Sequence, residues 1–251
     1  MLGYRDENIV TNFLSINNKW YIILYVRDNL IVMIAGSTGL VGNELAKQML
    51  EAEPIEKIYA LSRKPLPFFH SKLVTIQHPE LQVHEWESDD VQPKYGFICL
   101  GTTLKQAGSK PALEHVDYEL VCQVAQEMKL LGVTHLAVVS SLGASTRSFS
   151  HYLRCKGRME LALERLNFER LVIAHPGPLK GLRESPRKDE AVLQAVLRVV
   201  KPVMFGPLAN FVPIDAEDVA KAMQYSLFSH ATKKVEILDT VSMKALLNKY
   251  Q

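Results

Sequence analysis

Short apolar segments alternate with longer segments of mixed polarity along the chain from Leu30 onward. Residues 31–35 are apolar at every position, which is typical of a strand covered on both faces of a sheet. Val41, Leu45 and Met49 then recur every four residues and form one apolar stripe, as in an amphipathic helix. This alternation predicts a doubly wound parallel α/β sheet.

The same pattern predicts where the individual elements lie. The predicted strands cover residues 30–36, 57–62, 72–77, 95–101, 135–141, 170–175 and 234–238. The predicted helices cover residues 40–51, 112–131, 151–166, 190–200 and 216–229. Because strands and helices alternate, we expect helices on both faces of the sheet.

Two segments depart from this pattern. Residues 1–29 mix polar and aromatic positions without a clean period. We interpret them as an N-terminal extension, either loosely packed or read from an upstream start codon, or as an arm that pairs with a partner subunit. Residues 30–251 are long enough for one domain with its own core. Within that domain, residues 177–215 are richer in Pro, Gly and Arg, and we expect a small substrate lobe there.

The charge balance argues against two classes of partner. The chain has 251 residues, with 29 Lys and Arg against 27 Asp and Glu. Such a balance gives no large excess of positive charge with which to bind nucleic acid or an anionic membrane. The longest apolar segments near the start, residues 20–26 and 30–35, are too short to span a bilayer. We therefore expect no nucleic-acid or membrane partner, and a cytoplasmic location.

The cysteines and histidines show no metal-binding spacing. Cys99, Cys122 and Cys155 lie far apart in different predicted elements, and no CxxC or HExxH pair occurs. Reduced thiols are the ordinary state of such scattered cysteines in a cytosolic protein. The sequence therefore predicts no metal site.

A glycine-spaced turn follows the first predicted strand and opens the first helix. Glycines at such a point permit a tight turn, a close approach to a pyrophosphate, and close packing of helix on strand. The helix N-terminus then offers unpaired N–H groups to the phosphates. The alternative is a purely structural turn, but the strand–turn–helix context favours dinucleotide binding. The candidate cofactor-binding residues are Gly36, Ser37, Thr38, Gly39, Leu40, Val41 and Gly42.

The end of the second predicted strand indicates which dinucleotide binds. An NAD site expects an acidic residue there, to bind the ribose hydroxyls. The sequence has Arg63 and Lys64 instead, which suit a 2′-phosphate. The alternative is a solvated basic turn. We expect NADP(H) in preference to NAD(H).

A serine, a tyrosine and a lysine follow at a suggestive spacing. Ser140 and Ser141 end the predicted strand over residues 135–141, and Tyr152 and Lys156 lie four residues apart on the next helix. Residues four apart share a helix face, so the phenol and the ammonium can converge on one cleft. Such a tyrosine can exchange a proton with a carbonyl or alcohol oxygen, which a serine hydroxyl can hold in place. The alternative is an ordinary surface pair after a strand end.

Together these motifs resemble the short-chain dehydrogenase/reductase superfamily. The segments Cys-Leu-Gly-Thr-Thr at residues 99–103 and Ser-Ser-Leu-Gly-Ala at residues 140–144 resemble its atypical branch, around the human Tat-interacting protein. The resemblance covers about residues 30–240 and implies an NAD(P)-binding Rossmann fold. It further implies that Tyr152 is the proton donor, that Lys156 binds the nicotinamide ribose, and that Ser141 or Ser140 orients the substrate.

The resemblance also implies further cofactor contacts. Leu100, Gly101 and Thr102 would line the adenosine and nicotinamide side, and Pro176 and Gly177 would form a turn beside the nicotinamide.

The sequence departs from the better-known branch in the helix over residues 112–131, which has no asparagine to extend a proton relay. We interpret Asp117 in this helix as a solvated acid rather than a group that reaches the site.

Two functions are consistent with these residues. The first is NADPH-dependent reduction of a small carbonyl compound, so that the partner is a small carbonyl or alcohol substrate. The second is an NADP(H)-binding sensor or protein-interaction module with little or no turnover, which the missing relay asparagine favours. A protein partner or a homodimer is left open.

Overall fold

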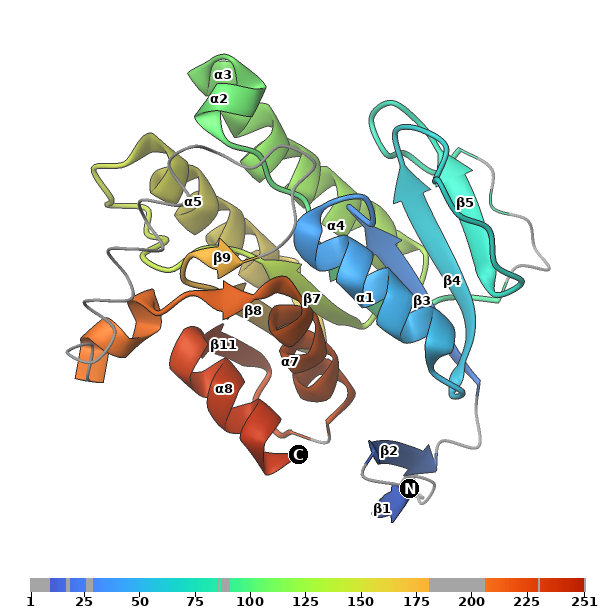
Figure 1. Ribbon diagram of the computed structural model, residues 1–251. Helices are drawn as coiled ribbons and strands as arrows, with labels where there is room; N and C mark the ends of the chain where they lie inside the picture. The colour runs from blue at the N-terminus through green and yellow to red at the C-terminus, as the bar shows by residue number, and fades with distance from the viewer. Residues whose placement is uncertain are drawn as a thin grey trace, which may run out of the picture.

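The computed structural model describes residues 10–16, 19–25, 29–84, 86, 91–180, 206–229 and 231–250. Its centre is a seven-stranded sheet in the order β11-β8-β7-β6-β3-β4-β5, and every pairing in it is parallel (Figure 1). This confirms the doubly wound α/β prediction. The strands are β3 (Leu30–Ala35), β4 (Ile55–Ser62), β5 (Leu73–Gln77), β6 (Tyr95–Ile98), β7 (His135–Val139), β8 (Arg170–His175) and β11 (Val235–Asp239).

Helices cover both faces of this sheet. One face packs against α1 (Leu40–Glu51), α7 (Ala216–Phe228) and α8 (Thr240–Lys249), and the other packs against α4 (Leu120–Leu130) and α5 (His151–Arg165) (Figure 1). The described residues also form shorter helices: α2 (Leu104–Ala107), α3 (Lys110–Glu114), the π-helical turn η1 (His115–Glu119) and the 3₁₀ helix η3 (Gly206–Phe211). Among the described helices, none is long and apolar enough to cross a membrane.

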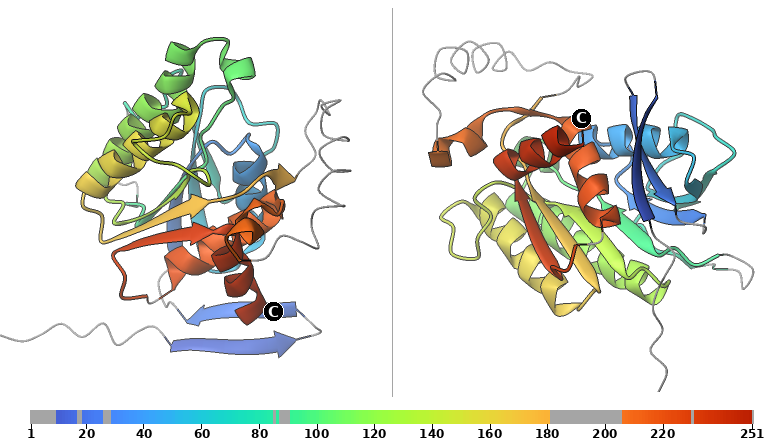
Figure 2. Two further views of the ribbon diagram at one scale, coloured as in Figure 1. Left: turned by 90° about the vertical axis from the view of Figure 1, so that its left-hand side faces the viewer. Right: turned by 90° about the horizontal axis from the view of Figure 1, so that it is seen from below.

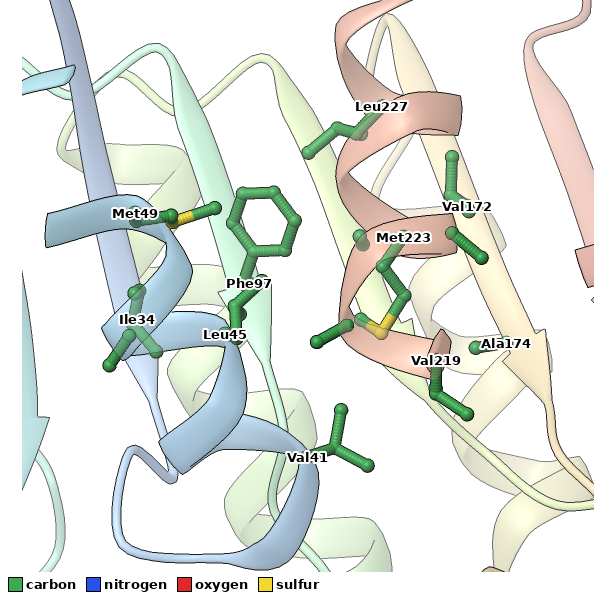
Figure 3. Packing of buried hydrophobic residues seen from close by; sticks show 14 of the residues in the cluster. Ile34, Val41, Leu45, Met49, Phe97, Val172, Ala174, Val219, Met223 and Leu227 are labelled. Atoms are coloured by element: carbon green, nitrogen blue, oxygen red, sulfur yellow. The ribbon is translucent and has the colours of Figure 1, made fainter. Parts of the chain in front are cut away.

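The core lies in two layers, one on each face of the sheet. All six residues of β3 are buried, as its unbroken apolar run predicts. In the layer under α1 and α7, Leu45, Met49 and Met223 converge on Phe97 of β6 (Figure 3). This layer holds α1 against the sheet, and so fixes where the N-terminus of α1 points.

Two smaller sheets lie outside the central one. Strands β1 (Val10–Ile16) and β2 (Lys19–Tyr25) pair antiparallel within the segment interpreted as an extension (Figure 2). Strands β9 (Leu179–Lys180) and β10 (Ile214–Asp215) pair in parallel and bracket part of the expected substrate lobe. The predicted helix over residues 190–200, and most of that lobe, lie outside the described residues.

The structure corrects several predicted boundaries. Strands β6 and β7 end at Ile98 and Val139, three and two residues earlier than predicted, because the chain leaves the sheet there to form loops at its carboxyl edge. The predicted helix over residues 112–131 begins at Lys110 and is interrupted by η1. Helices α2 and α8 and the β1–β2 hairpin were not predicted, because each is short or lacks a clean apolar period.

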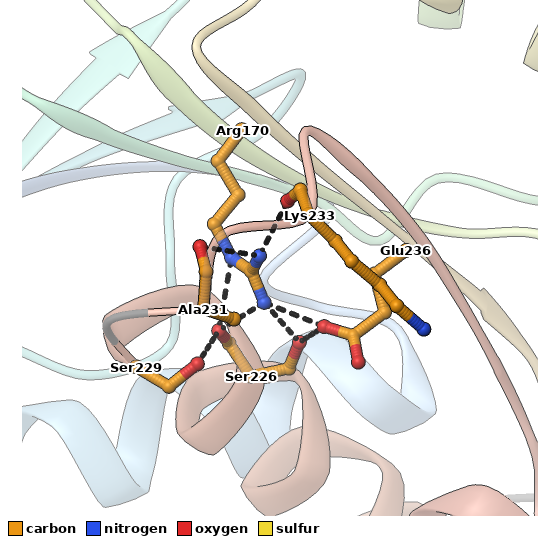
Figure 4. Close-up of polar contacts among 6 residues, drawn as sticks. All are labelled: Arg170, Ser226, Ser229, Ala231, Lys233 and Glu236. Atoms are coloured by element: carbon orange, nitrogen blue, oxygen red, sulfur yellow. Dashed lines mark hydrogen bonds and ion pairs between the residues drawn. The ribbon is translucent and has the colours of Figure 1, made fainter.

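A buried arginine joins the far edge of the sheet to α7. Arg170 is 3% exposed and begins β8. Its guanidinium donates to the carbonyl oxygens of Ser226 (2.8 Å) and Lys233 (2.7 Å), and pairs with the carboxylate of Glu236 (Figure 4). Because these groups come from α7, the following loop and β11, one side chain satisfies polar atoms from three segments.

Replacing this arginine is expected to destabilise the fold. Arg170→Ala should lower the free energy of unfolding by about 3 kcal/mol, since it leaves the Glu236 carboxylate and the carbonyl groups of Ser226 and Lys233 without their partner. The stability of Arg170→Lys should lie between those of wild type and Arg170→Ala, because an ammonium keeps the positive charge but not the planar set of donors of a guanidinium. Urea denaturation measures both, with the exposed Arg165→Ala as a control expected within about 0.5 kcal/mol of wild type. Equal stability of Arg170→Ala and Arg165→Ala would contradict this account.

Candidate functional site

The glycine turn after β3 is fixed by backbone packing at two positions. Gly36 has φ +90°, and a Cβ there would lie 2.7 Å from the carbonyl carbon of Cys99. A Cβ at Gly42 would overlap the Gly36 carbonyl oxygen. Glycine is therefore required at both positions to bring β3, the N-terminus of α1 and the end of β6 together.

Gly39 and Ser37 are not explained by packing alone. A Cβ at Gly39 would meet only ordinary contacts, with the nearest atom 3.4 Å away. Gly39 also caps α1 without a side-chain acceptor, so the first-turn N–H groups of α1 are left to another partner. Ser37 is 2% exposed, and its hydroxyl has no hydrogen-bond partner within the described residues. Uncapped N–H groups beside an unsatisfied hydroxyl fit an anion such as a pyrophosphate.

The basic turn lies at the end of β4, which pairs with β3. Arg63 and Lys64 are exposed, and the hydroxyl of Ser62 donates to the Lys64 carbonyl oxygen at 2.6 Å, which shapes the turn. Within the part of the chain that the structure describes, neither cationic head is held in a hydrogen bond or ion pair. The turn can therefore present both charges to a ligand that lies across the carboxyl ends of β3 and β4.

A buried ion pair lies at the carboxyl ends of the central strands. The Lys156 ammonium is 2.9 Å from Oδ1 of Asp117, and the two side chains are 2% and 0% exposed. The ammonium also lies 3.4 Å from the Leu100 carbonyl oxygen and 3.3 Å from that of Val139. Lys156 therefore reaches from α5 to the ends of β6 and β7, where ligands of open α/β sheets bind.

Asp117 is not the solvated acid expected from the sequence. It is fully buried at the centre of η1, and its Oδ2 accepts a hydrogen bond from the Thr102 backbone N–H at 3.0 Å. The π-helical turn shifts the helix register, and such turns occur often at functional sites. Asp117 thus connects the loop after β6 to Lys156.

The two serines after β7 have different partners. The Ser140 hydroxyl is buried and donates to Oε1 of Glu160, which is also 2.8 Å from Nε2 of His175. Ser141 is half-buried, and its hydroxyl makes only a long contact of 3.4 Å with the Leu142 carbonyl oxygen. Of the two hydroxyls, that of Ser141 is the one available to a ligand.

The tyrosine lies near the start of α5. Tyr152 is half-buried one helical turn before Lys156, and Ser150 caps the helix by accepting from the Leu153 N–H. Gly157 packs so closely on the loop after β7 that a Cβ would overlap the backbone of Ser145. The start of α5 is thereby held against the loop that carries Ser141.

The remaining predicted cofactor residues line the ends of β6 and β8. Leu100 is buried, Gly101 is exposed, and Thr102 is half-buried. Pro176 is buried, and the Gly177 N–H donates to Oγ1 of Thr240 at 2.9 Å. Leu100, Gly101 and Thr102 therefore lie beside the Lys156–Asp117 pair, and Pro176 and Gly177 lie after β8 at the same edge of the sheet.

A thiol lies between the glycine turn and this pair. Burial raises the pKa of Cys99 to about 12, although the nearby Lys156 charge lowers it somewhat. The group therefore stays a neutral thiol near pH 7, and we assign it a packing role at the end of β6.

Comparison with known proteins identifies the family. A family model described as HIM1 matches residues 95–205. The chain is 32% identical to the mitochondrial protein FMP52 of Eremothecium gossypii over 218 residues, which cover 86% of this chain and 96% of that protein. It is 30% identical to protein HTATIP2 of Rattus norvegicus over 230 residues, 88% of this chain and 89% of that protein. The chain belongs to the atypical short-chain dehydrogenase/reductase family.

Solved structures agree with this family at the level of the fold. MoeE5 in complex with UDP-glucose and NAD superposes with a TM-score of 0.60 at 15% identity, covering 86% of this chain and 79% of that chain. The human epimerase family protein SDR39U1 (isoform 2) with NADPH gives a TM-score of 0.57 at 17% identity, covering 84% and 74%. The chain thus has the NAD(P)-binding Rossmann fold of the short-chain dehydrogenase/reductase family.

Asp117 and Glu160 belong to this site but were not assigned to it from the sequence. Asp117 lies in a helix whose register changes at η1, so a regular helical wheel misplaces it. Glu160 lies four residues after Lys156, and this i, i+4 spacing places both on one face of α5. That spacing was the available signal for Glu160.

The glycine turn gives a test that separates packing from binding. Gly39→Ala should fold like wild type but bind a dinucleotide at least about tenfold more weakly, since ~1.4 kcal/mol of phosphate contact would be lost. Gly42→Ala should instead lose more than about 2 kcal/mol of stability, because its Cβ meets rigid backbone. Thermal melts and fluorescence titration with NADPH and NADH measure the two effects. Wild-type affinity in Gly39→Ala would show that this glycine does not face the ligand.

Proposed function

We propose that the chain is an NADPH-dependent reductase of a small carbonyl compound. The observation that carries the proposal is the placement of the Lys156 ammonium at the ends of β6 and β7, one helical turn from the half-buried Tyr152. Tyr152 and Lys156 of α5 and Ser141 after β7 belong to segments that meet at the carboxyl edge of the sheet, where the glycine turn also opens α1. The substrate class is a small carbonyl or alcohol, with no role for nucleic acid or membrane.

The residues have separate tasks in this reaction. NADPH, when bound, supplies the hydride that reduces the carbonyl carbon. The Tyr152 phenol donates a proton to the carbonyl oxygen, which the Ser141 hydroxyl holds by a hydrogen bond. Ser140 is not assigned to this task, because its hydroxyl is bound to Glu160. Lys156, one helical turn after Tyr152, is the residue proposed to bind the nicotinamide ribose.

Asp117 has a positioning role in the proposal. Its carboxylate neutralises the buried Lys156 ammonium and holds the Thr102 N–H, so the loop after β6 and the lysine keep one geometry. The expected relay asparagine is absent, but an anionic side chain contacts the lysine from the same predicted helix. The missing asparagine favours a module without turnover, but the contact between Asp117 and Lys156 favours the reductase.

We propose NADPH rather than NADH as the cofactor. The exposed Arg63 and Lys64 at the end of β4 support this choice, since a 2′-phosphate would meet both. Of the two solved structures with this fold, MoeE5 is in complex with NAD and SDR39U1 with NADPH.

Removing the basic turn should change cofactor preference. Arg63→Ala with Lys64→Ala should weaken NADPH binding by about 10–100-fold, corresponding to ~1.4–2.8 kcal/mol, and leave NADH binding within about twofold. Isothermal titration with each cofactor measures this, with the exposed Arg165→Ala as a control for the loss of a positive charge elsewhere on the surface. An equal loss for both cofactors would contradict recognition of a 2′-phosphate by this turn.

Turnover is tested with Tyr152→Phe. NADPH absorbance is followed with a panel of aldehydes, ketones and quinones, and the variant should lose at least about 10²-fold in rate with NADPH affinity unchanged within about twofold. Parallel loss of rate and affinity would overturn the assigned role. A wild-type protein that binds NADPH but consumes none with any panel member would contradict the reductase and favour the cofactor-sensing module.

We further propose a reducing compartment for this protein. The three cysteines are free in the structure, and the sequence predicts the cytoplasm, whereas the fungal relatives are named mitochondrial. Imaging of the fluorescently tagged full chain beside cytosolic and mitochondrial markers distinguishes the two locations.

A further inference from the structure

A cluster of three metal-ligating side chains lies beside the start of α5. It consists of Glu114, the last residue of α3, with His151 and Cys155 of α5. One donor atom from each lies within 4.8 Å of the others. Neither the proposed hydride transfer nor the cofactor contacts use any of these side chains.

Two of the three members of this cluster can be recognised in the sequence. His151 and Cys155 are four residues apart, so they share one face of α5. The third member comes from another helix 37 positions earlier, which is why the spacing of cysteines and histidines alone predicted no metal site. The structure brings Glu114 to the pair because α3 packs against α5.

Two of the three donor–donor distances are close to those of a tetrahedral site. Sγ of Cys155 is 3.6 Å from Nε2 of His151, and Nε2 is 3.7 Å from Oε2 of Glu114. In a tetrahedral zinc site, a nitrogen about 2.0 Å and a sulfur about 2.3 Å from the ion are about 3.5 Å apart. The two distances that meet at Nε2 of His151 therefore lie within a few tenths of an ångström of those in such a site, and every pair of donors lies within 4.8 Å.

The surroundings of the cluster also suit a cation. Glu114 uses its other oxygen, Oε1, to pair with Arg158, whose guanidinium lies 4.3 Å from the centroid of the Tyr118 ring. An outer partner of this kind holds a ligating carboxylate in orientation. The Cys155 residue is 1% exposed, whereas the His151 and Glu114 side chains are 25% and 26% exposed, so an ion can enter from their side.

We propose that Glu114, His151 and Cys155 bind one Zn²⁺ ion, with water as the fourth ligand. A carboxylate and a thiolate balance the charge of the ion, and a neutral imidazole completes the set. The cysteine binds as thiolate, and its proton passes to the solvent. Nε2 of His151 lies 3.3 Å from the Lys110 carbonyl oxygen, and it binds the ion in the tautomer that carries the ring proton on Nδ1.

Zinc bound here would join α3 to the start of α5. Tyr152 lies between the two α5 ligands in the sequence, and Lys156 directly follows one of them. The ion would therefore hold the helical segment that carries both residues. The binding proposal stands independently of the reductase activity, since its measurement needs neither cofactor nor substrate.

Cobalt binding tests the site. The full chain, freed of metal by a chelator and kept reduced, is titrated with Co²⁺, which enters zinc sites and absorbs in the near ultraviolet when a thiolate binds it. We expect a band that saturates at about one equivalent and is displaced by Zn²⁺. Cys155→Ser should abolish the band, and the matched control Cys122→Ser should retain it.

Two further variants keep the result independent of folding. His151→Gln and Glu114→Gln alter partly exposed side chains and should each weaken Co²⁺ binding by about tenfold or more, with circular dichroism unchanged. Absence of the band in wild type would overturn the proposal. So would a band that persists in Cys155→Ser, or one that is lost in Cys122→Ser.

Discussion

The ion pair between Lys156 and Asp117 is the constraint on which the site depends. An ammonium in a dry interior is costly unless a counter-charge and hydrogen-bond acceptors surround it. Asp117 supplies the charge, and the carbonyl oxygens of Leu100 and Val139 supply the acceptors. Because these groups come from η1 and from the ends of β6 and β7, the pair can form only when helix, loop and sheet are docked. Its formation therefore fixes the start of α5 relative to the central strands.

The Lys156–Asp117 pair also affects how charge is distributed along the carboxyl edge of the sheet. Lys156 and Asp117 neutralise each other beneath the strand ends, so the deep part of the site carries little net charge. The positive groups lie instead at the N-terminus of α1 and at the exposed turn of Arg63 and Lys64. Such an arrangement attracts the phosphates of a dinucleotide at the positively charged end of this edge.

Local sequence was sufficient where local interactions decide the structure. The bounds of α1 and β8 agree with prediction because an apolar stripe or run defines each one. The sequence could not choose between Ser140 and Ser141, since the deciding partner, Glu160, comes from another element. It also misplaced Asp117, because the register shift at η1 is visible only once the helix is packed against α5 and the loop after β6. Residues 181–205, which include most of the expected substrate lobe, lie outside the described residues.

The π-helical turn has a consequence for how this chain can vary. A regular α-helix advances by about 100° per residue, so one residue more or less rotates everything beyond it onto another face. Within η1 the wider turn accommodates an extra residue, and both α3 before it and α4 after it keep an apolar face on the protein. The length of the segment over residues 110–130 is therefore constrained, because Asp117 and the buried residues of α4 depend on this register. Deletion of one residue from this segment would move the Asp117 carboxylate away from the buried Lys156 ammonium, although every other residue would be unchanged.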